Sequence, residues 1–147
     1  MKYIFYILPA LAGVTITTQA GVNSQLRVAI NNPWLAAFIS FFVGTCFLGL
    51  VLVVTRQPVP SFTQLKNIEL YKFTGGLLGT FFVTVMILTV QKIGAANVFA
   101  LVIASQLLMA MLYDHLGLFG IPQSGISWLK VLGALMLIGG AYLINKK

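Results

Sequence analysis

Five stretches of this chain are long enough and apolar enough to cross a lipid bilayer as helices. They cover about residues 3–22, 33–54, 72–90, 93–113 and 128–144, and charged side chains occur only near their ends. A helix needs about 20 apolar residues to span a hydrocarbon core, and lipid accepts only helices or closed barrels. The alternation expected of barrel strands is missing. The sequence therefore predicts an all-α integral membrane protein, with five transmembrane helices in one domain over residues 1–147.

The composition argues against a soluble protein. Hydrophobic residues make up 59% of the chain and charged residues 7%, whereas soluble domains are about a quarter charged. Nine lysines and arginines outnumber Glu69 and Asp114, but they flank the apolar runs instead of clustering as in a nucleic-acid-binding protein. We therefore expect lipid and a small-molecule solute as partners, and no nucleic acid. The lone Cys46 excludes a disulfide within the chain, and neither a metal nor a cofactor is expected.

Local signals mark the helix boundaries. Asn32 before Pro33 predicts an N-cap followed by proline in the first turn, and Ser61-x-x-Gln64 predicts a capping box in the loop over residues 55–71. An alternative is that Lys2 and the apolar run after it form a secretory signal peptide, which would leave four helices. The run already reaches spanning length, so a transmembrane helix is favoured.

The basic residues divide almost equally between the two sides of a five-helix protein. Five lie on one side and four on the other, so the positive-inside rule supplies little orienting force. Insertion in both orientations would allow an antiparallel homodimer, in which two chains form the inverted repeat that larger transporters encode in one. A fixed orientation is the alternative. The two sets are Lys2, Arg56, Lys66, Lys72 and Lys130 on one side, and Arg27, Lys92, Lys146 and Lys147 on the other.

Few polar side chains lie inside the predicted spans, and these are the candidates for a solute site. Thr15, Gln19 and Asn23 are spaced by four residues and share one helix face. Asn97, Ser105 and Gln106 lie in the fourth span. Polar groups in hydrocarbon are costly unless they are paired, so these six either line a cavity or bond neighbouring helices. The two alternatives are level for Gln19 and Gln106, and pairing is favoured for Asn97 at its helix start.

No charged residue or histidine lies in the middle of any span, which disfavours proton-coupled export of cations. Asp114 and His115, at the end of the fourth span, are a candidate proton-coupling pair, although a polar cap before a turn at Gly117 is favoured. No arrangement of nucleophile and base appears, so no catalytic residue and no enzymatic activity are expected. Small residues suited to helix packing or dimerisation occur at Gly75, Gly79, Gly133, Gly139 and Gly140.

Several sequence blocks together resemble the YdcZ-like family of the drug/metabolite transporter superfamily. They are residues 19–26 (QAGVNSQL), 36–41 (AAFISF) with Gly44-Thr45, 75–79 (GGLLG), and Ser105-Gln106 through residues 114–120 (DHLGLFG). The resemblance covers nearly the whole chain. It implies a multi-pass protein of the bacterial inner membrane, built as a five-helix unit that works as an inverted dimer. Gln91 stands where the family often has proline, and Ser105 where it often has glycine.

These observations lead to one hypothesis and two rivals. We expect a secondary transporter or facilitator of a small polar, neutral or anionic solute, which works by alternating access as an antiparallel homodimer. A channel would need a continuous polar line through the membrane, and only scattered threonines are available. A membrane partner or assembly subunit that does not itself transport would also fit a bundle with few functional groups.

Overall fold

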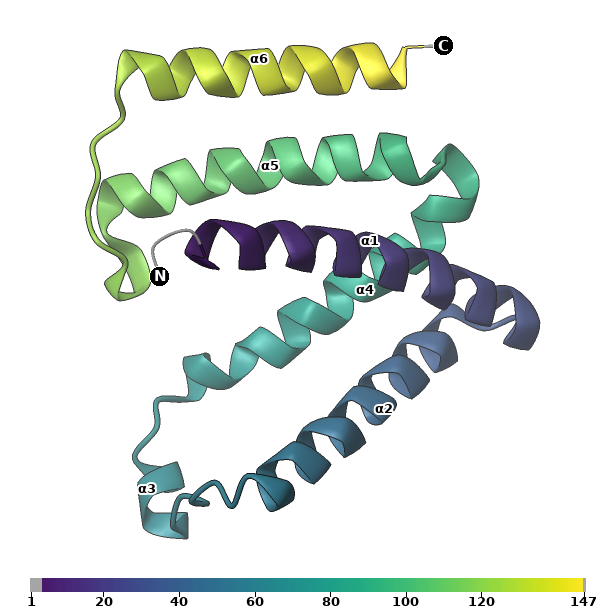
Figure 1. Ribbon diagram of the computed structural model, residues 1–147, viewed down its shortest axis with the longest axis vertical. Helices are drawn as coiled ribbons and strands as arrows, with labels where there is room; N and C mark the ends of the chain where they lie inside the picture. The colour runs from purple at the N-terminus through teal and green to yellow at the C-terminus, as the bar shows by residue number, and fades with distance from the viewer. Residues whose placement is uncertain (1–3, 147) are drawn as a thin grey trace. The chain divides into compact units, whose positions relative to one another are not determined.

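The computed structural model describes residues 4–146, and every regular element in that range is a helix (Figure 1). The chain divides into two compact units, Met1–Lys92 and Ile93–Lys147. The elements are α1 (Ile4–Ile30), α2 (Pro33–Val54), α3 (Phe62–Lys66), η1 (Leu70–Phe73), α4 (Thr74–Ile93), α5 (Ala95–Leu116), η2 (Leu118–Gly120) and α6 (Trp128–Asn145).

Four of the helical segments between residues 4 and 146 are long and apolar enough to cross a membrane: Pro33–Val54, Leu70–Ile93, Ala95–Leu116 and Trp128–Asn145. These helices agree with the integral membrane character predicted from sequence. With 27 residues, α1 is the longest helix, but Gln19, Asn23, Gln25 and Arg27 make its second half polar. That α1 is the fifth span stays a prediction.

The helix α1 extends further than the apolar run that predicted it. It continues past Val22 to Ile30, because the polar residues after Val22 are compatible with helical backbone. It ends where Asn31 adopts a positive φ of 51° and Asn32 caps the next helix. The Asn32 side chain accepts hydrogen bonds from the backbone N–H groups of Trp34 and Leu35, at 3.0 and 3.1 Å. This confirms the N-cap predicted from the Asn32-Pro33 pair.

The capping box in the loop between α2 and α4 is also confirmed. The Ser61 backbone N–H donates to Gln64 Oε1 at 2.8 Å, and the Gln64 N–H donates to Ser61 Oγ at 3.3 Å. These reciprocal bonds satisfy two of the otherwise unpaired donors at a helix start, so the short helix α3 is stable enough to form.

In the first unit, α1, α2 and α4 pack around a small core. Ala36, Ala37 and Ile87 are buried, and Leu26, Ile30 and Val83 pack against them. Further along α2, the Phe41 ring lies beside Gly79. Since residues 36–41 of α2 meet residues 87–79 of α4, these two helices are antiparallel. The hairpin makes α1 antiparallel to α2 as well, so the carboxyl ends of α1 and α4 lie at the hairpin end of the unit.

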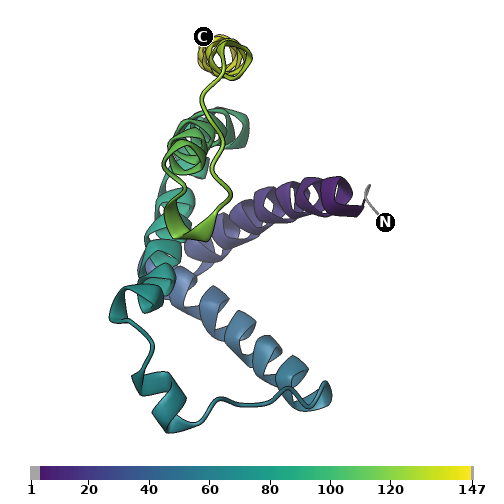
Figure 2. The same cartoon turned by 90° about the vertical axis from the view of Figure 1, so that its left-hand side faces the viewer.

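Outside this core, α1 and α2 diverge from their hairpin (Figure 2). Most large apolar side chains on the helices are exposed, including Phe42, Val53 and Leu77. Such exposure would be unfavourable in water, whereas lipid solvates apolar side chains as well as a protein core does. The burial pattern therefore agrees with a protein whose solvent is the membrane interior.

In the second unit, α5 and α6 lie side by side (Figure 1). The side chains of Ala134 and Ala141 on α6 are buried. Gly94 separates α4 from α5 with a φ of 85°, and Gly117 ends α5 in the left-handed conformation with a φ of 63°. Both angles are accessible to glycine and costly for other residues. Gly94 therefore separates α4 from α5 without a proline at this point of the chain.

The core of the first unit gives a stability prediction. Replacing the fully buried Ile87 by alanine should lower the free energy of unfolding by about 2–5 kcal/mol, because packing is lost and a cavity remains. Leu77→Ala on the same helix, where the leucine is 72% exposed, should cost less than about 1 kcal/mol. Denaturant titration of the purified protein in detergent checks both values, and equal losses in the two variants would contradict this core.

Candidate solute site

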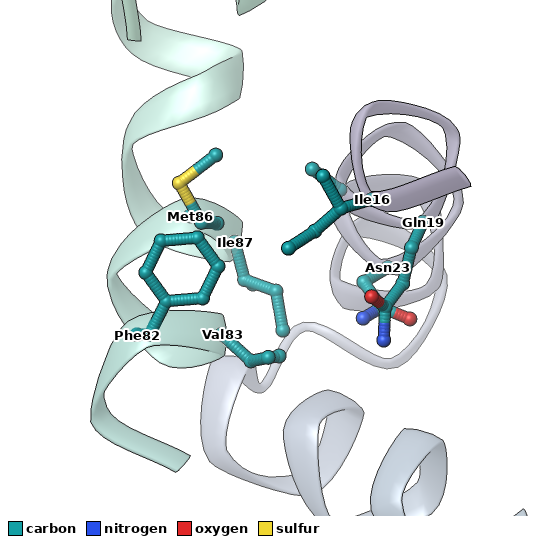
Figure 3. A pocket seen from close by; sticks show the side chains of 8 residues that line it. Ile16, Gln19, Asn23, Phe82, Val83, Met86 and Ile87 are labelled. Atoms are coloured by element: carbon teal, nitrogen blue, oxygen red, sulfur yellow. The ribbon is translucent and has the colours of Figure 1, made fainter. Parts of the chain in front are cut away.

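Two amide side chains of α1 lie at a small crevice against α4. Gln19 and Asn23 are one helical turn apart, and Figure 3 shows their amide groups on the same side of α1. The crevice has a volume of about 10 Å³, which is close to the minimum for one water molecule. Apolar side chains form the rest of its wall. The lining residues are Ile16, Gln19, Ala20 and Asn23 from α1, and Phe82, Val83, Met86 and Ile87 from α4.

The same two amides also line a larger groove between α1 and α2, with a volume of about 570 Å³. This is enough space for a small organic solute. Five of its lining residues carry a polar side chain: Thr15, Thr18, Gln19 and Asn23 from α1, and Ser40 from α2. Three of the six residues predicted from sequence, namely Thr15, Gln19 and Asn23, therefore lie together on the wall of one groove.

The polar groups around these two hollows differ in their hydrogen bonding. Thr15 and Thr18 each donate to the backbone carbonyl four residues earlier, at 2.9 Å, so their hydrogens are already used. Asn23 is only 5% exposed, and within residues 4–146 its side chain has no hydrogen bond. Ser24 Oγ and Thr84 Oγ1, whose residues line neither hollow, are buried without a hydrogen-bond partner among the described residues. These polar groups can still form hydrogen bonds. Leaving such a group buried without a partner costs about 1–3 kcal/mol, so binding a partner here would be favourable.

The other three predicted residues lie on α5, in the second unit. Asn97 Nδ2 donates to the Ile93 carbonyl at 2.7 Å, and the Asn97 carbonyl accepts from Asn145 Nδ2 at 3.5 Å. Asn97 therefore helps to join α5 to α6. Ser105 Oγ donates to the Val102 carbonyl at 2.9 Å, and Gln106 is exposed. A binding role for Asn97, Ser105 and Gln106 stays a prediction.

The Asp114-His115 pair lies where α5 ends and the chain folds back. The Asp114 carbonyl accepts from the Ser124 N–H at 2.8 Å, and the His115 carbonyl accepts from Gln123 Nε2 at 2.9 Å. These bonds satisfy backbone acceptors that a helix end leaves unpaired. Neither side chain takes part in an ion pair in the described range, where the ion pair present joins Lys72 to Glu69. Proton coupling by this pair stays a prediction.

Most of the glycines predicted to pack helices face open space within the chain. A Cβ atom built at Gly75, Gly133, Gly139 or Gly140 would meet no atom within 4 Å, while at Gly79 it would lie 3.7 Å from Phe41 Cζ. Gly140 also lines an apolar hollow between α5 and α6. Their role in dimerisation stays a prediction.

Sequence reasoning missed several residues of the two hollows. Ser40 lies alone between apolar residues of α2, so no polar pattern marked it. Thr18 stands beside Gln19, and its position at the groove depends on how α2 packs. Met86 and Ile87 are indistinguishable in sequence from lipid-facing residues, and only their burial separates them.

The sequence of the chain is similar to one family of membrane proteins. Residues 4–143 match the family model described as "Putative inner membrane exporter, YdcZ". The chain is 29% identical over 131 residues to the inner membrane protein YdcZ of Escherichia coli strain K12, an alignment that covers 86% of this chain and 87% of the relative. No solved structure matches the chain. The matches show a multi-pass inner membrane protein of a family described as exporters.

The end of α5 gives a second stability prediction. A carboxylate near a helix C-terminus interacts unfavourably with the helix dipole, and the bonds that end α5 at Asp114 come from its backbone. Asp114→Asn should therefore change the free energy of unfolding by less than about 0.5 kcal/mol. Unfolding in detergent measures this change, and a loss of several kcal/mol would show that the Asp114 carboxylate is structurally required.

Proposed function

The chain belongs to the YdcZ family of inner membrane proteins, and from this premise we propose that it exports a small polar, neutral or anionic solute by alternating access as an antiparallel homodimer. The direction of transport follows the description of its family. Gln19 and Asn23 bind the solute in this proposal, and Thr15 and Ser40 line the same groove.

The observation that carries the proposal is the position of the two α1 amides. Gln19 and Asn23 reach both the groove against α2 and the crevice against α4. If these amides served only to join helices, their hydrogen bonds would be made within the unit. Asn23 is only 5% exposed as a residue, and its amide makes no such bond within residues 4–146, so it is free to bond a solute or a water molecule in the crevice or the groove.

The residues at the groove define which solutes it suits. Amides and hydroxyls donate and accept hydrogen bonds, and none of the groove residues is acidic. A cationic solute would lose its hydration and find no carboxylate to compensate for the loss. A neutral polar molecule, or an anion that accepts hydrogen bonds from the amide N–H groups, fits the groove better. The apolar remainder of the wall accommodates a hydrocarbon portion of the solute.

The antiparallel dimer is supported by the distribution of basic residues. With five on one side and four on the other, the two insertion orientations have similar free energies. Two oppositely inserted copies would each contribute an α1–α2 groove. Exchange between conformations open to opposite sides would then be symmetric, as in transporters with inverted repeats.

Transport should depend on the α1 amides. In proteoliposomes loaded with a panel of polar solutes and analysed by mass spectrometry, Gln19→Ala and Asn23→Ala should lower efflux of the transported solute at least about tenfold, since hydrogen bonds are lost at the site. Gln25→Ala is the matched control, because Gln25 is an exposed amide of the same helix that lines neither hollow.

All three variants should remain dimeric by size exclusion. Efflux at the wild-type rate in both Gln19→Ala and Asn23→Ala would refute the proposed site. If no solute leaves vesicles that contain only the wild-type protein, the function of a partner subunit is favoured instead.

Dual insertion gives a separate prediction. Fusions of the C-terminus to alkaline phosphatase and to a green fluorescent protein should both be active, since each reports one side of the membrane. Replacing Arg56, Lys66 and Lys72 by glutamine changes the basic residues from five against four to two against four. The C-terminal side then becomes cytoplasmic, so fluorescence rises and phosphatase activity falls. Arg56→Lys should change neither signal. Activity of a single reporter in the wild-type protein would exclude dual insertion.

A further inference from the structure

We propose that Arg27 binds an oxyanion, a carboxylate or a phosphate, at the hairpin end of the polar face of α1. The inference deepens the proposed function, on which it rests: it assigns to the solute an anionic group that Arg27 holds while the rest of the molecule contacts the Asn23 and Gln19 amides.

Arg27 is the least exposed basic residue described in the first unit. Arg56, Lys66, Lys72 and Lys92 are all exposed, whereas Arg27 is half-buried in the last turn of α1. A guanidinium that has lost part of its hydration requires hydrogen-bond acceptors in place of water. The Arg27 side chain therefore differs from a solvated surface cation.

Among the described residues, Arg27 is a partly buried basic side chain without a partner, whereas the basic side chains that also lack one, such as Arg56 and Lys92, are exposed. Lys72 Nζ lies 3.3 Å from a Glu69 carboxylate oxygen, and Lys66 Nζ lies 4.8 Å from the centre of the Phe62 ring. The half-buried Lys130 donates to Ser124 Oγ at 2.7 Å and to the Gly125 carbonyl at 3.1 Å. The comparison with Lys130 is the most informative, because that residue is also partly buried and has two acceptors within the chain.

The first unit has no carboxylate available for Arg27. Glu69 is the one acidic residue in residues 1–92 of the sequence, and it already pairs with Lys72. Glu69 also precedes α4, while Arg27 lies at the carboxyl end of α1. Because α1 and α4 both run antiparallel to α2, these two positions are at opposite ends of the unit. An anion that pairs with Arg27 would therefore have to come from outside this unit.

The position of Arg27 connects it to the candidate solute site. It follows Asn23 by four residues, so the two side chains lie one turn apart on neighbouring parts of the same helix face. Asn23 and Ala20, which is also buried, line the crevice against α4. An anion held at Arg27 would place an attached polar group next to the Asn23 amide.

The chemistry of arginine selects the class of anion. A guanidinium presents five N–H donors in one plane and can give two parallel hydrogen bonds to a carboxylate or a phosphate. Chloride is a single acceptor atom, so it cannot match the two parallel bonds that a group with two oxygens accepts. The position of Arg27 in the last turn of α1 is favourable, because the helix dipole attracts a positive charge there. This attraction does not supply hydrogen-bond acceptors for all five N–H donors. A solute anion and a lipid phosphate have the same chemistry, and the experiment separates them.

The test uses the full-length protein in a maltoside detergent without phospholipid. The midpoint of thermal unfolding is measured against increasing inorganic phosphate or acetate, with potassium chloride at matched ionic strength as the reference. Wild-type protein should show a saturable stabilisation by at least one of the two anions beyond that of chloride, because a ligand of the folded state raises its stability. In Arg27→Gln the apparent affinity should fall at least about tenfold, the loss expected for one charged hydrogen-bonding partner.

Two further variants keep the result interpretable. Lys92→Gln removes an exposed cation from the same end of the unit and should retain the wild-type response. Arg27→Lys keeps the charge without the planar donor pair, and should lie between wild type and Arg27→Gln. If Arg27→Gln does not fold, the apparent anion affinities of Arg27→Lys and Lys92→Gln are compared instead. A lower affinity in Arg27→Lys supports the site, and equal affinities contradict it.

The possible outcomes distinguish a solute anion from a lipid headgroup, and they test the anion site separately from the proposed function. If added phosphatidylglycerol stabilises the protein through Arg27 while phosphate and acetate do not, the oxyanion site stands and its occupant is a lipid headgroup. Equal anion responses in wild type, Arg27→Lys and Arg27→Gln would overturn the site. Efflux that does not depend on Gln19 or Asn23 would refute the proposed function and leave this binding measurement unaffected. Amide-dependent efflux by a wild-type protein that phosphate, acetate and phosphatidylglycerol all fail to stabilise would refute only the anion site.

Discussion

The cost of placing a polar group in hydrocarbon governs this structure. An unpaired amide or hydroxyl in an apolar medium loses several kcal/mol relative to water, and a charge loses more. The chain meets this constraint by using almost no charged residue inside its helices and by returning most threonine hydroxyls to the backbone of their own helix. The side chains that do not follow this rule, Asn23 above all, therefore mark where a binding site can exist.

The same constraint limits the chemistry available to the protein. Without a carboxylate in the middle of a span, the chain has no buried acid to exchange a proton for a cation. What remains is hydrogen bonding by amides and hydroxyls, with one partly buried guanidinium at the end of the polar face. In the proposed function, such a set would recognise a solute by its hydrogen-bond acceptors and donors, and would bind it weakly enough for release on the other side of the membrane.

The elements that could be predicted from sequence are those set by local interactions. The Asn32 cap and the Ser61–Gln64 box depend on residues two to three positions apart, so the motif and the structure coincide. The bounds of α2 could also be predicted, because its apolar run lies between the N-cap Asn32 and the C-cap Thr55. Hydropathy located α1 but not its end, since the polar residues after Val22 leave the apolar run without leaving the helix.

What could not be predicted depends on packing between segments distant in the chain. Ser40 gains significance only because α2 folds back along α1 and places it on the groove beside Thr18. The wall formed by Met86 and Ile87 arises in the same way. The pattern of Thr15, Gln19 and Asn23 was found because four-residue spacing is a property of one helix. Asn97 and Gln106 belong to a different unit, and no local pattern decides whether they approach the same solute.

The central claim is that the polar face of α1 borders a water-accessible cavity instead of joining helices. Cysteine accessibility tests it directly, since thiosulfonates react with a thiolate, which forms in water and not in lipid. In a Cys46→Ser background, which removes the native cysteine, Gln19→Cys should react with a small membrane-impermeant thiosulfonate in intact vesicles. Leu50→Cys, at an exposed apolar position of α2, should not react. If the cysteine at position 19 were as unreactive as the one at position 50, the groove would be filled by lipid or protein, and the account of a solute site on α1 would be contradicted.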